Sequence, residues 1–438
     1  MWGTPVKKGR KASGGFSRRD FLKAGAVAGA AALATRLKGN LVFAAGADKI
    51  RVGVIGCGKR GAQAAQDCVK SSTGVEVTAL ADVFPDRVNA LKAACKVKDD
   101  HCFVGLDAYK ALLASPDVDL VVLATPQAFR PVHVTEAIAK GKHVLMEAPV
   151  AVCPAGIKMV IEASNAAKEK KLAVGGGFQK RHDPAYVETV KRLRDGAIGK
   201  LLTAQCYTNQ GCPEVYKKKD NESDVEWQLR NWRFFIWLSG DHIVDAHAQR
   251  LDVVNWALNA QPDNIHSLGS RQSRSAPEYG NTYDHFGTEF FYPGDISVIS
   301  MCRNIEGTEE RIGEHLVGAK GSTDCCGTIK GETAWKYDGP KADPYVQEFT
   351  DLIKSIRDGA PLNEGQAAAD STLSAIMARE SGYMRQQFRR QFFTSKCTQS
   401  LLPPEGLKLS DAKPMDAIPD PNRYKFPGFP EEQPKKRK

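Results

Sequence analysis

The stretch KIRVGVIGCGKRGAQAAQDCV, residues 49–69, decides the fold of the first half of this chain. Apolar residues dominate from Ile50 to Ile55, which predicts a buried strand. Residues 56–61 then read GxGxxG, and the pattern from Ala62 onward predicts a helix. A strand, a glycine-rich turn and a helix in this order form the first unit of a nucleotide-binding fold.

Each glycine of this turn has a separate expected task. Gly56 permits the tight turn, Gly58 lets the backbone approach a pyrophosphate, and Gly61 lets the helix pack closely on the strand. Lys59 and Arg60 lie within this turn, and the N-terminus of the helix that follows supplies free amide groups for the phosphates. These five residues are therefore predicted to bind a dinucleotide; the alternative is a glycine-rich turn without a ligand.

The next strand supplies the acidic residue that a dinucleotide site needs. The segment VEVTALAD, residues 75–82, ends in Asp82, 21 positions after Gly61. Its carboxylate is placed to accept the ribose hydroxyls and would repel a 2′-phosphate, so NAD is favoured over NADP. Arg87 lies close enough in sequence to keep NADP as the second candidate.

Helix and strand patterns alternate through the rest of the first domain. This βαβ series predicts a doubly wound parallel sheet of the Rossmann type over residues 48–172. The expected helices cover residues 85–95, 107–114, 131–140 and 154–170. The expected strands cover residues 101–104, 118–125, 143–148 and 172–177.

Two strand ends in this series carry polar or small residues. Ligands of such sheets lie beyond the carboxyl ends of the strands. Thr125 and Pro126 lie at the end of one strand, and Glu147 and Ala148 at the end of another. We therefore expect these four residues to line the nicotinamide half of the crevice.

The pattern changes after Gly177. Strands are expected at residues 201–208, 285–292 and 296–303, and helices at 343–359 and 366–385. The segment 173–397 is therefore predicted to be a separate α+β domain. Residues 398–438 are rich in proline and predict an extended tail.

The stretch WLSGDHIVDAHAQRLDVVNW, residues 237–256, holds the catalytic candidates. On one helix, His242, Asp245 and Gln249 would share a stripe. A carboxylate beside an imidazole can orient it for proton transfer. The alternative is a helix start capped by Ser239 or Asp241.

Further candidates lie outside this stretch. Lys180 and Arg181 follow a predicted strand end, where they would bind hydroxyls or a carboxylate; the alternative is a solvated basic turn. Trp232 would stack on a sugar face, or else belongs to the core. No cluster of ligating side chains has the spacing of a metal site.

The ordered motifs of this chain resemble those of the glucose–fructose oxidoreductase, inositol dehydrogenase and rhizopine-catabolism (Gfo/Idh/MocA) oxidoreductases, over roughly residues 49–385. The matching segments are GxGxxG at 56–61, ALAD at 79–82, ATP at 124–126, GKHVLMEAP at 141–149, and residues 245–256. The resemblance implies a second domain with a large, mostly antiparallel sheet. It also implies NAD(P)-dependent chemistry on a sugar or cyclitol, and a homo-oligomer.

The chain departs from that family at two catalytic positions. The family reads Glu-Lys-Pro where this chain has Glu147-Ala148-Pro149, and Asp-x-x-x-His where this chain has Asp245 and Gln249. The resemblance implies that the missing lysine contacts nicotinamide and substrate.

These departures leave three hypotheses open. In the first, the protein is an oxidoreductase. His242 is the first candidate for the group that moves the hydroxyl proton and Lys180 is the second, with Asp245 supporting the base. In the second, it is a glycosidase or lyase that oxidises its substrate transiently. In the third, it is a non-catalytic protein that holds the cofactor and binds a ligand.

The N-terminus reads as an export signal. FSRRDFLKAGAVAGAAALAT, residues 16–35, contains the twin-arginine pattern followed by a short Ala/Gly-rich apolar run. Residues 1–47 are therefore predicted to direct the folded protein through the twin-arginine export machinery to the periplasm. The alternative is an amphipathic tail.

The charge of the chain is concentrated at its ends. The formal net charge is +10, but residues 1–45 and 435–438 carry all of it, and the remainder is slightly acidic. Nucleic-acid binding therefore has no electrostatic support. The 11 cysteines show no disulfide or metal pattern.

Overall fold

The structure is a computed structural model that describes residues 49–414 and 416–420. The predicted signal segment 1–47 and the end of the tail lie outside the described residues. None of the helices within the described ranges combines the length and apolar character needed to span a membrane.

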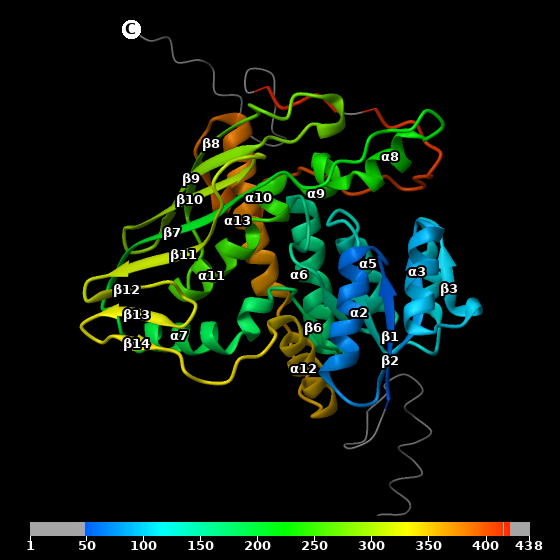
Figure 1. The fold of residues 1–438 in the computed structure, drawn as a ribbon, viewed down its shortest axis with the longest axis horizontal. Helices are drawn as coiled ribbons and strands as arrows, with labels where there is room; N and C mark the ends of the chain where they lie inside the picture. Colours follow the sequence, from blue (N-terminus) through cyan, green and yellow to red (C-terminus); the bar gives the residue numbers. More distant parts are fainter. Residues whose placement is uncertain (1–48, 415, 421–438) are drawn as a thin grey trace, which may run out of the picture. The chain divides into compact units, whose positions relative to one another are not determined.

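The first sheet has six parallel strands in the order β3-β2-β1-β4-β5-β6, so the predicted doubly wound sheet is confirmed (Figure 1). Its strands are β1 (Ile50–Ile55), β2 (Val75–Asp82), β3 (Cys102–Val104), β4 (Leu120–Leu123), β5 (His143–Met146) and β6 (Val174–Gly175). Its helices are α2 (Lys59–Ser71), α3 (Pro85–Cys95), α4 (Ala108–Ala114), α5 (Arg130–Ala139) and α6 (Pro154–Glu169).

Both faces of this sheet are covered. Side chains of β1 and β2 pack with α2, α3 and α12 (Pro344–Arg357) on one face. Side chains of β4 and β5 pack with α4, α5 and α6 on the other face. Burial on both sides explains why β4 and β5 are apolar without alternation, since every residue of both strands is buried.

The predicted boundary at residue 172 does not match the sheet. β6 lies beyond this boundary and completes the parallel sheet. The helix α12, predicted to belong to the second domain, packs against α2 through Phe349 and Leu352. The reason is that a helix pattern shows which face is apolar but not which sheet covers that face.

The second sheet has nine strands in the order β14-β13-β12-β11-β7-β10-β9-β8-β15, and is mostly antiparallel as predicted. Its long strands are β7 (Leu201–Gln210), β8 (Asn264–Ser270), β9 (His285–Tyr292), β10 (Ile296–Asn304) and β11 (Arg311–Gly318). Its short strands are β12 (Gly321–Thr323), β13 (Thr328–Gly331), β14 (Trp335–Lys336) and β15 (Phe388–Arg389). β7 and β10 run parallel to each other, whereas the other pairs of this sheet that the described residues form are antiparallel.

Helices cover one face of the second sheet. These are α10 (His242–Asp245), α11 (Ala248–Leu258) and α13 (Gly365–Met384), which contact β7 to β11. The short helices α7 (Pro184–Arg194), α8 (Asp224–Arg230), α9 (Ile236–Ser239) and α14 (Arg390–Ser395) complete this half, together with three 3-10 turns at 179–182, 232–234 and 277–279. A further 3-10 turn, at 99–101, precedes β3 of the first sheet.

The described part of the tail has neither helix nor strand, in agreement with the predicted extended segment. It is held by side chains of the second domain: Ser223 Oγ donates to the Leu409 carbonyl, and Tyr283 Oη donates to the Pro419 carbonyl at 2.7 Å. All 11 cysteines lie among the described residues and are free thiols.

Candidate functional site

A cleft of about 570 Å³ opens beyond the carboxyl ends of β1, β2 and β4. On the side of the parallel sheet, its lining includes the whole GxGxxG turn, Asp82, Arg87, Thr125 and Pro126. On the opposite side it is lined by residues around α8, including Trp232 and Arg233. The structure thus brings most of the predicted cofactor residues to one cavity.

The three glycines of the turn have the surroundings that a dinucleotide turn needs. Gly56 has φ +96°, and a Cβ there would lie 2.7 Å from the Ala124 backbone. A Cβ on Gly61 would lie 1.8 Å from the Gly56 carbonyl oxygen. By contrast, a Cβ on Gly58 would meet nothing closer than Arg87 Nη1 at 3.9 Å, so this backbone is open toward the cleft.

The helix that follows is free to bind an anion. Gly58 is the N-cap of α2 and provides no capping side chain, and the first turn contains no acidic residue. The amide groups and positive dipole end of a 13-residue helix therefore face the cleft without a competing carboxylate on that turn. The residues present fit the pyrophosphate of a dinucleotide.

Asp82 closes the other side of the turn. Its Oδ2 accepts from Cys57 N at 2.6 Å, and its Oδ1 accepts from Phe84 N at 2.9 Å. Burial raises the pKa of Asp82, although these hydrogen bonds favour the carboxylate. Arg87 also lines the cleft, and its guanidinium lies 4.6 Å from the centre of the Phe84 ring.

The two central residues of the motif behave differently from each other. Lys59 is exposed and pairs with Glu214 at 3.2 Å. Arg60 turns toward the end of β5, where its Nη2 lies 2.8 Å from Glu147 Oε1, and its guanidinium lies 4.2 Å from the centre of the Tyr345 ring. Glu147 is therefore held by Arg60 rather than left free to contact a ligand.

Arg130 was not expected from the sequence and organises the strand ends. It is buried at the start of α5, with Nε donating to the Thr125 carbonyl at 2.9 Å. Its Nη1 donates to the carbonyls of Glu147 and Pro149 at 2.8 and 2.5 Å. Burial lowers the pKa of Arg130 to about 10. One guanidinium thus fixes the loops after β4 and β5 to each other.

Asp245 reaches the end of β4 from the second domain. Its Oδ1 accepts from Gln127 Nε2 at 2.5 Å, and its Oδ2 lies 3.4 Å from Arg233 Nε. Gln127 directly follows the strand-end Pro126, and Arg233 lines the cleft. Asp245 is therefore beside the expected nicotinamide half.

Gln249 reaches the end of β5. Its Nε2 donates to the Gly177 carbonyl at 3.5 Å. Gly177 in turn abuts Ala148, since a Cβ on Gly177 would lie 2.3 Å from Ala148 N. The two positions at which this chain departs from the family pattern therefore lie near each other.

His242 does not join this group. The predicted single helix is wrong, because α10 ends at Asp245 and a new helix, α11, starts at Ala248. His247 at this break is buried and bonds Thr208 Oγ1 at 2.8 Å and Ser300 Oγ at 2.6 Å. The helix is broken where His247 bonds these two strands. No local sequence pattern can predict such bonds.

The expected partnership of His242 with Asp245 is also wrong. His242 Nδ1 contacts Asp241 Oδ1 at 2.9 Å, and its ring packs at 5.3 Å from Phe286 of β9. Asp241 also caps α10 by accepting from His242 N, as the alternative interpretation expected. His242, like Lys180, is not among the residues that line the cleft. Its role as a base stays a prediction.

Lys180 sits in a partly buried polar network. Its Nζ donates to Tyr186 Oη at 2.6 Å, and Tyr186 Oη donates to Glu314 Oε2 at 3.3 Å. Arg250, which directly follows Gln249 in sequence, also pairs with Glu314 at 2.9 Å. Burial and the Arg250 charge lower the pKa of Lys180. The lysine is thus positioned by hydrogen bonds and has a weakened hold on its proton.

The two residues predicted to contact substrate have different surroundings. Trp232 lines the cleft. Arg181 forms an ion pair with the buried Asp252, with Nε and Nη2 at 2.9 and 2.8 Å from its carboxylate oxygens. This pair has a structural role, and substrate binding by Arg181 stays a prediction.

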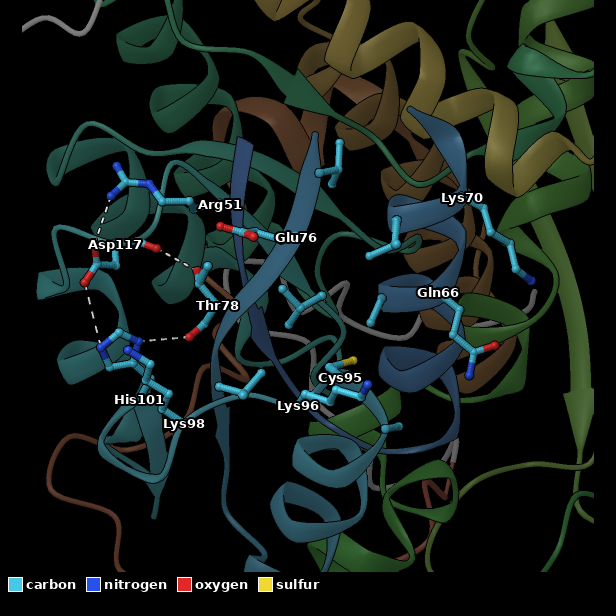
Figure 2. Close-up of a pocket in the computed structure, with 16 residues that line it drawn as sticks. Arg51, Gln66, Lys70, Glu76, Thr78, Cys95, Lys96, Lys98, His101 and Asp117 are labelled. Carbon is cyan, nitrogen blue, oxygen red and sulfur yellow. Dashed lines mark hydrogen bonds and ion pairs between the residues drawn. The ribbon is translucent and has the colours of Figure 1, made fainter. Parts of the chain in front are cut away.

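A second cavity, of about 680 Å³, lies at the amino ends of β1 and β2, opposite the glycine turn (Figure 2). Its polar side chains pair with each other: Arg51 bonds Asp117 at 3.0 Å, and His101 Nδ1 contacts the Thr78 carbonyl at 3.1 Å. Ligands of doubly wound sheets bind at the carboxyl ends, so we assign the site to the smaller cleft.

Comparison with known proteins agrees with this geometry. Residues 50–178 match the family model described as "Oxidoreductase family, NAD-binding Rossmann fold", and residues 15–35 match the twin-arginine translocation signal. The chain is therefore an NAD-binding oxidoreductase homologue with an export signal.

Individual relatives extend the match into the second domain. An inositol 2-dehydrogenase of Saccharopolyspora erythraea is 35% identical over 354 residues, which cover 76% of this chain and 94% of the relative. An inositol 2-dehydrogenase of Acidothermus cellulolyticus is 28% identical over 231 residues, and the match spans only 60% of that relative's length.

The aldose-aldose oxidoreductase of Caulobacter crescentus has the same fold, with a TM-score of 0.63 at 16% identity over 78% of this chain and 99% of that one. Together with the dinucleotide cleft and the near full-length relative, this places the chain in the Gfo/Idh/MocA family of oxidoreductases.

Proposed function

We propose that this protein oxidises or reduces a hydroxyl-bearing carbon of a sugar or cyclitol with NAD(P), after export to the periplasm. The observation that carries the proposal is the meeting of Asp245 and Gln249 with the strand ends beside a dinucleotide cleft. The relatives are inositol 2-dehydrogenases, which supports a cyclitol or a related polyol as substrate.

The expected fit of the cofactor follows from the cleft. The start of α2 and Gly58 would hold the pyrophosphate, and Asp82 would accept the adenosine ribose hydroxyls. Thr125 and Pro126 would lie at the nicotinamide half. When bound, the nicotinamide supplies hydride transfer.

The proton of the reacting hydroxyl needs a separate acceptor, because Ala148 cannot take it. We assign this task to Lys180 in place of His242. Its pKa is lowered by burial and by Arg250, its Nζ is held by Tyr186, and a short turn joins it to Gly177 beside Ala148. A lysine whose pKa is lowered gives up its proton more readily, which favours its use as a base. Asp245 and Gln249 would orient the hydroxyls.

The first test uses purified mature protein. The protein is denatured and the supernatant assayed for NAD(H) and NADP(H), while intact protein is exposed to a panel of sugars and cyclitols under reduced-nicotinamide absorbance. A polyol that reduces the bound cofactor supports the proposal. Conversion of a glycoside without net reduced nicotinamide would instead indicate the lyase or glycosidase hypothesis.

Variants then separate the proton acceptors. Lys180→Met is expected to lower kcat at least about a hundredfold, since general base catalysis contributes at least that much. Lys191→Met, an exposed lysine on α7, is the matched control. A Lys180→Met protein with unchanged kcat, and a His242→Gln protein without activity, would return the role to His242.

A second candidate function follows from Ala148 and Gln249. Since both usual catalytic side chains are replaced, the protein could hold cofactor and bind a polyol without turnover. Turnover that appears only in Ala148→Lys would favour this non-catalytic function, and turnover in the parent protein would exclude it.

A further inference from the structure

Three ligating side chains that lie far apart in sequence meet in the interior of the molecule. His182 comes from the 3-10 turn 179–182, Glu348 from α12, and Glu364 from the residue before α13. One ligand atom of each lies within 4.8 Å of the others. His182 and Glu348 are only 8% and 1% exposed.

Two polar atoms of this cluster lack a hydrogen bond. Glu348 Oε1 is buried without a partner. His182 Nε2 lies 3.2 Å from Glu364 Oε1, but without hydrogen-bond geometry. A buried carboxylate without a donor is costly, and a second carboxylate beside it adds repulsion. A cation between the three side chains would remove both costs.

The outer contacts orient the ligand atoms inward. His182 Nδ1 lies 2.7 Å from Asp351 Oδ2, and an ionised carboxylate can only accept, so the ring proton belongs on Nδ1. The lone pair of Nε2 then faces the two glutamates. Glu364 is held by Gly176 N, which donates to its Oε2 at 3.0 Å. A carboxylate behind a histidine and a bonded ligand carboxylate are typical of the surroundings of metal sites.

We propose that His182 Nε2, Glu348 and Glu364 bind one divalent transition metal ion, with Zn²⁺ and Mn²⁺ as the candidates that an imidazole and two carboxylates suit. The ion would join α12, the start of α13 and the 3-10 turn 179–182. Gly176, which bonds Glu364, adjoins Gly177 at the Ala148 backbone, so the ion would also fix the strand end beside the reaction site. Its role is structural, and the proposal stands independently of the proposed reaction.

The competing arrangement needs no metal. Although burial lowers it, the neighbouring carboxylates of Asp351 and Glu364 raise the pKa of His182 to about 10, which would place a proton on Nε2. The cluster would then be a buried ionic network with a protonated histidine. Metal content separates the two arrangements directly.

The test measures metal in the full-length protein, purified without chelator. Elemental analysis is expected to find about one zinc or manganese ion per chain. After dialysis against EDTA, titration with Zn²⁺ alone and with Mn²⁺ alone is expected to restore one ion and to raise the melting temperature.

Glu348→Gln and His182→Ala are expected to weaken binding of that ion at least tenfold. Asp358→Asn, an exposed carboxylate at the end of α12, is the matched control and should bind as the parent does. Should a variant fail to fold, the parent protein decides the question alone. A parent protein that contains no metal, binds neither ion, and melts at the same temperature with EDTA and with Zn²⁺ would overturn the proposal.

Discussion

Asp82 is already engaged by the protein before any ligand is present. Both of its oxygens accept backbone amides of the residues that flank the turn, Cys57 and Phe84. Asp82 also lines the cleft. A single carboxylate therefore shapes the turn and is placed to select the ribose.

Replacing Asp82 by Asn is expected to weaken NAD binding about tenfold, a loss of about 1.4 kcal/mol, because a charged acceptor for the ribose hydroxyls is lost. The ratio of NADP to NAD affinity should rise, since the repulsion of a 2′-phosphate disappears and Arg87 remains. Titration of both cofactors by intrinsic fluorescence measures this. Glu76→Gln, at the other end of β2, is the control; an unchanged affinity ratio in Asp82→Asn would contradict the assignment.

At the scale of elements, different glycines of the β1–α2 turn serve folding and binding. Packing requires a glycine at position 61, because a Cβ there would overlap the Gly56 carbonyl oxygen. Gly58 is not required by packing. The two glycines, three residues apart in one motif, are thus needed for different physical reasons.

Gly61→Ala is expected to destabilise the protein by about 3 kcal/mol or more, because the added methyl group overlaps backbone that cannot move freely. Gly58→Ala should unfold at nearly the parent urea concentration but bind NAD more than tenfold more weakly, since the methyl group occupies the approach of the pyrophosphate. Urea unfolding and NAD titration of both proteins measure this difference. Equal loss of stability in the two variants would disprove it.

At the scale of the whole molecule, three histidines are buried. Burial lowers the pKa of His133 and of His247 to about 3, and that of His143 to about 4. They lie in both halves of the chain, on α5, before α11 and on β5. In the unfolded chain the same imidazoles take up a proton near pH 6.5.

Between pH 6.5 and about 4, the unfolded state therefore binds more protons than the native state, and stability falls as the pH falls. Each of the three histidines is expected to remove about 2 kcal/mol between pH 7 and pH 5. Urea unfolding at both pH values measures the loss. His247→Gln should reduce the pH dependence, whereas His266→Gln, at an exposed position of β8, should leave it unchanged. Equal pH dependence in parent and His247→Gln would contradict this account.

A second property of the whole molecule concerns the face of the nine-stranded sheet that lies opposite its helices. Met301 and Leu268 are 46% and 67% exposed and are both paired with Gly287, which has no side chain between them. They alternate with residues that face α11 and α13, so they point to the uncovered face. We expect this face to contact a second copy of the chain.

The parent protein is therefore expected to elute as a homo-oligomer in light scattering coupled to gel filtration. A Met301→Glu and Leu268→Glu double variant should shift toward the monomer, because charge at the centre of an apolar contact is costly. Val104→Glu, an exposed apolar position on the parallel sheet, is the control. A parent protein that is monomeric at micromolar concentration would refute the assignment.

The sequence by itself determined the parallel sheet, its glycine turn and the acidic end of β2, because these depend on local pattern: apolar runs, positive φ and fixed spacing along the chain. It also located the helices 343–359 and 366–385, which the structure has as α12 and α13. The alternation of βαβ units then leaves little freedom in how the sheet is assembled.

The tertiary structure alone decided which polar groups meet. Asp241, not Asp245, bonds His242, because the helix breaks where His247 bonds two strands. Arg130 fixes three carbonyls that belong to separate loops, and His182 meets two glutamates from distant helices. Such contacts depend on how elements pack after they form. They are selected because a buried polar group without a partner is costly, and no local stretch of sequence shows which partner packing will bring.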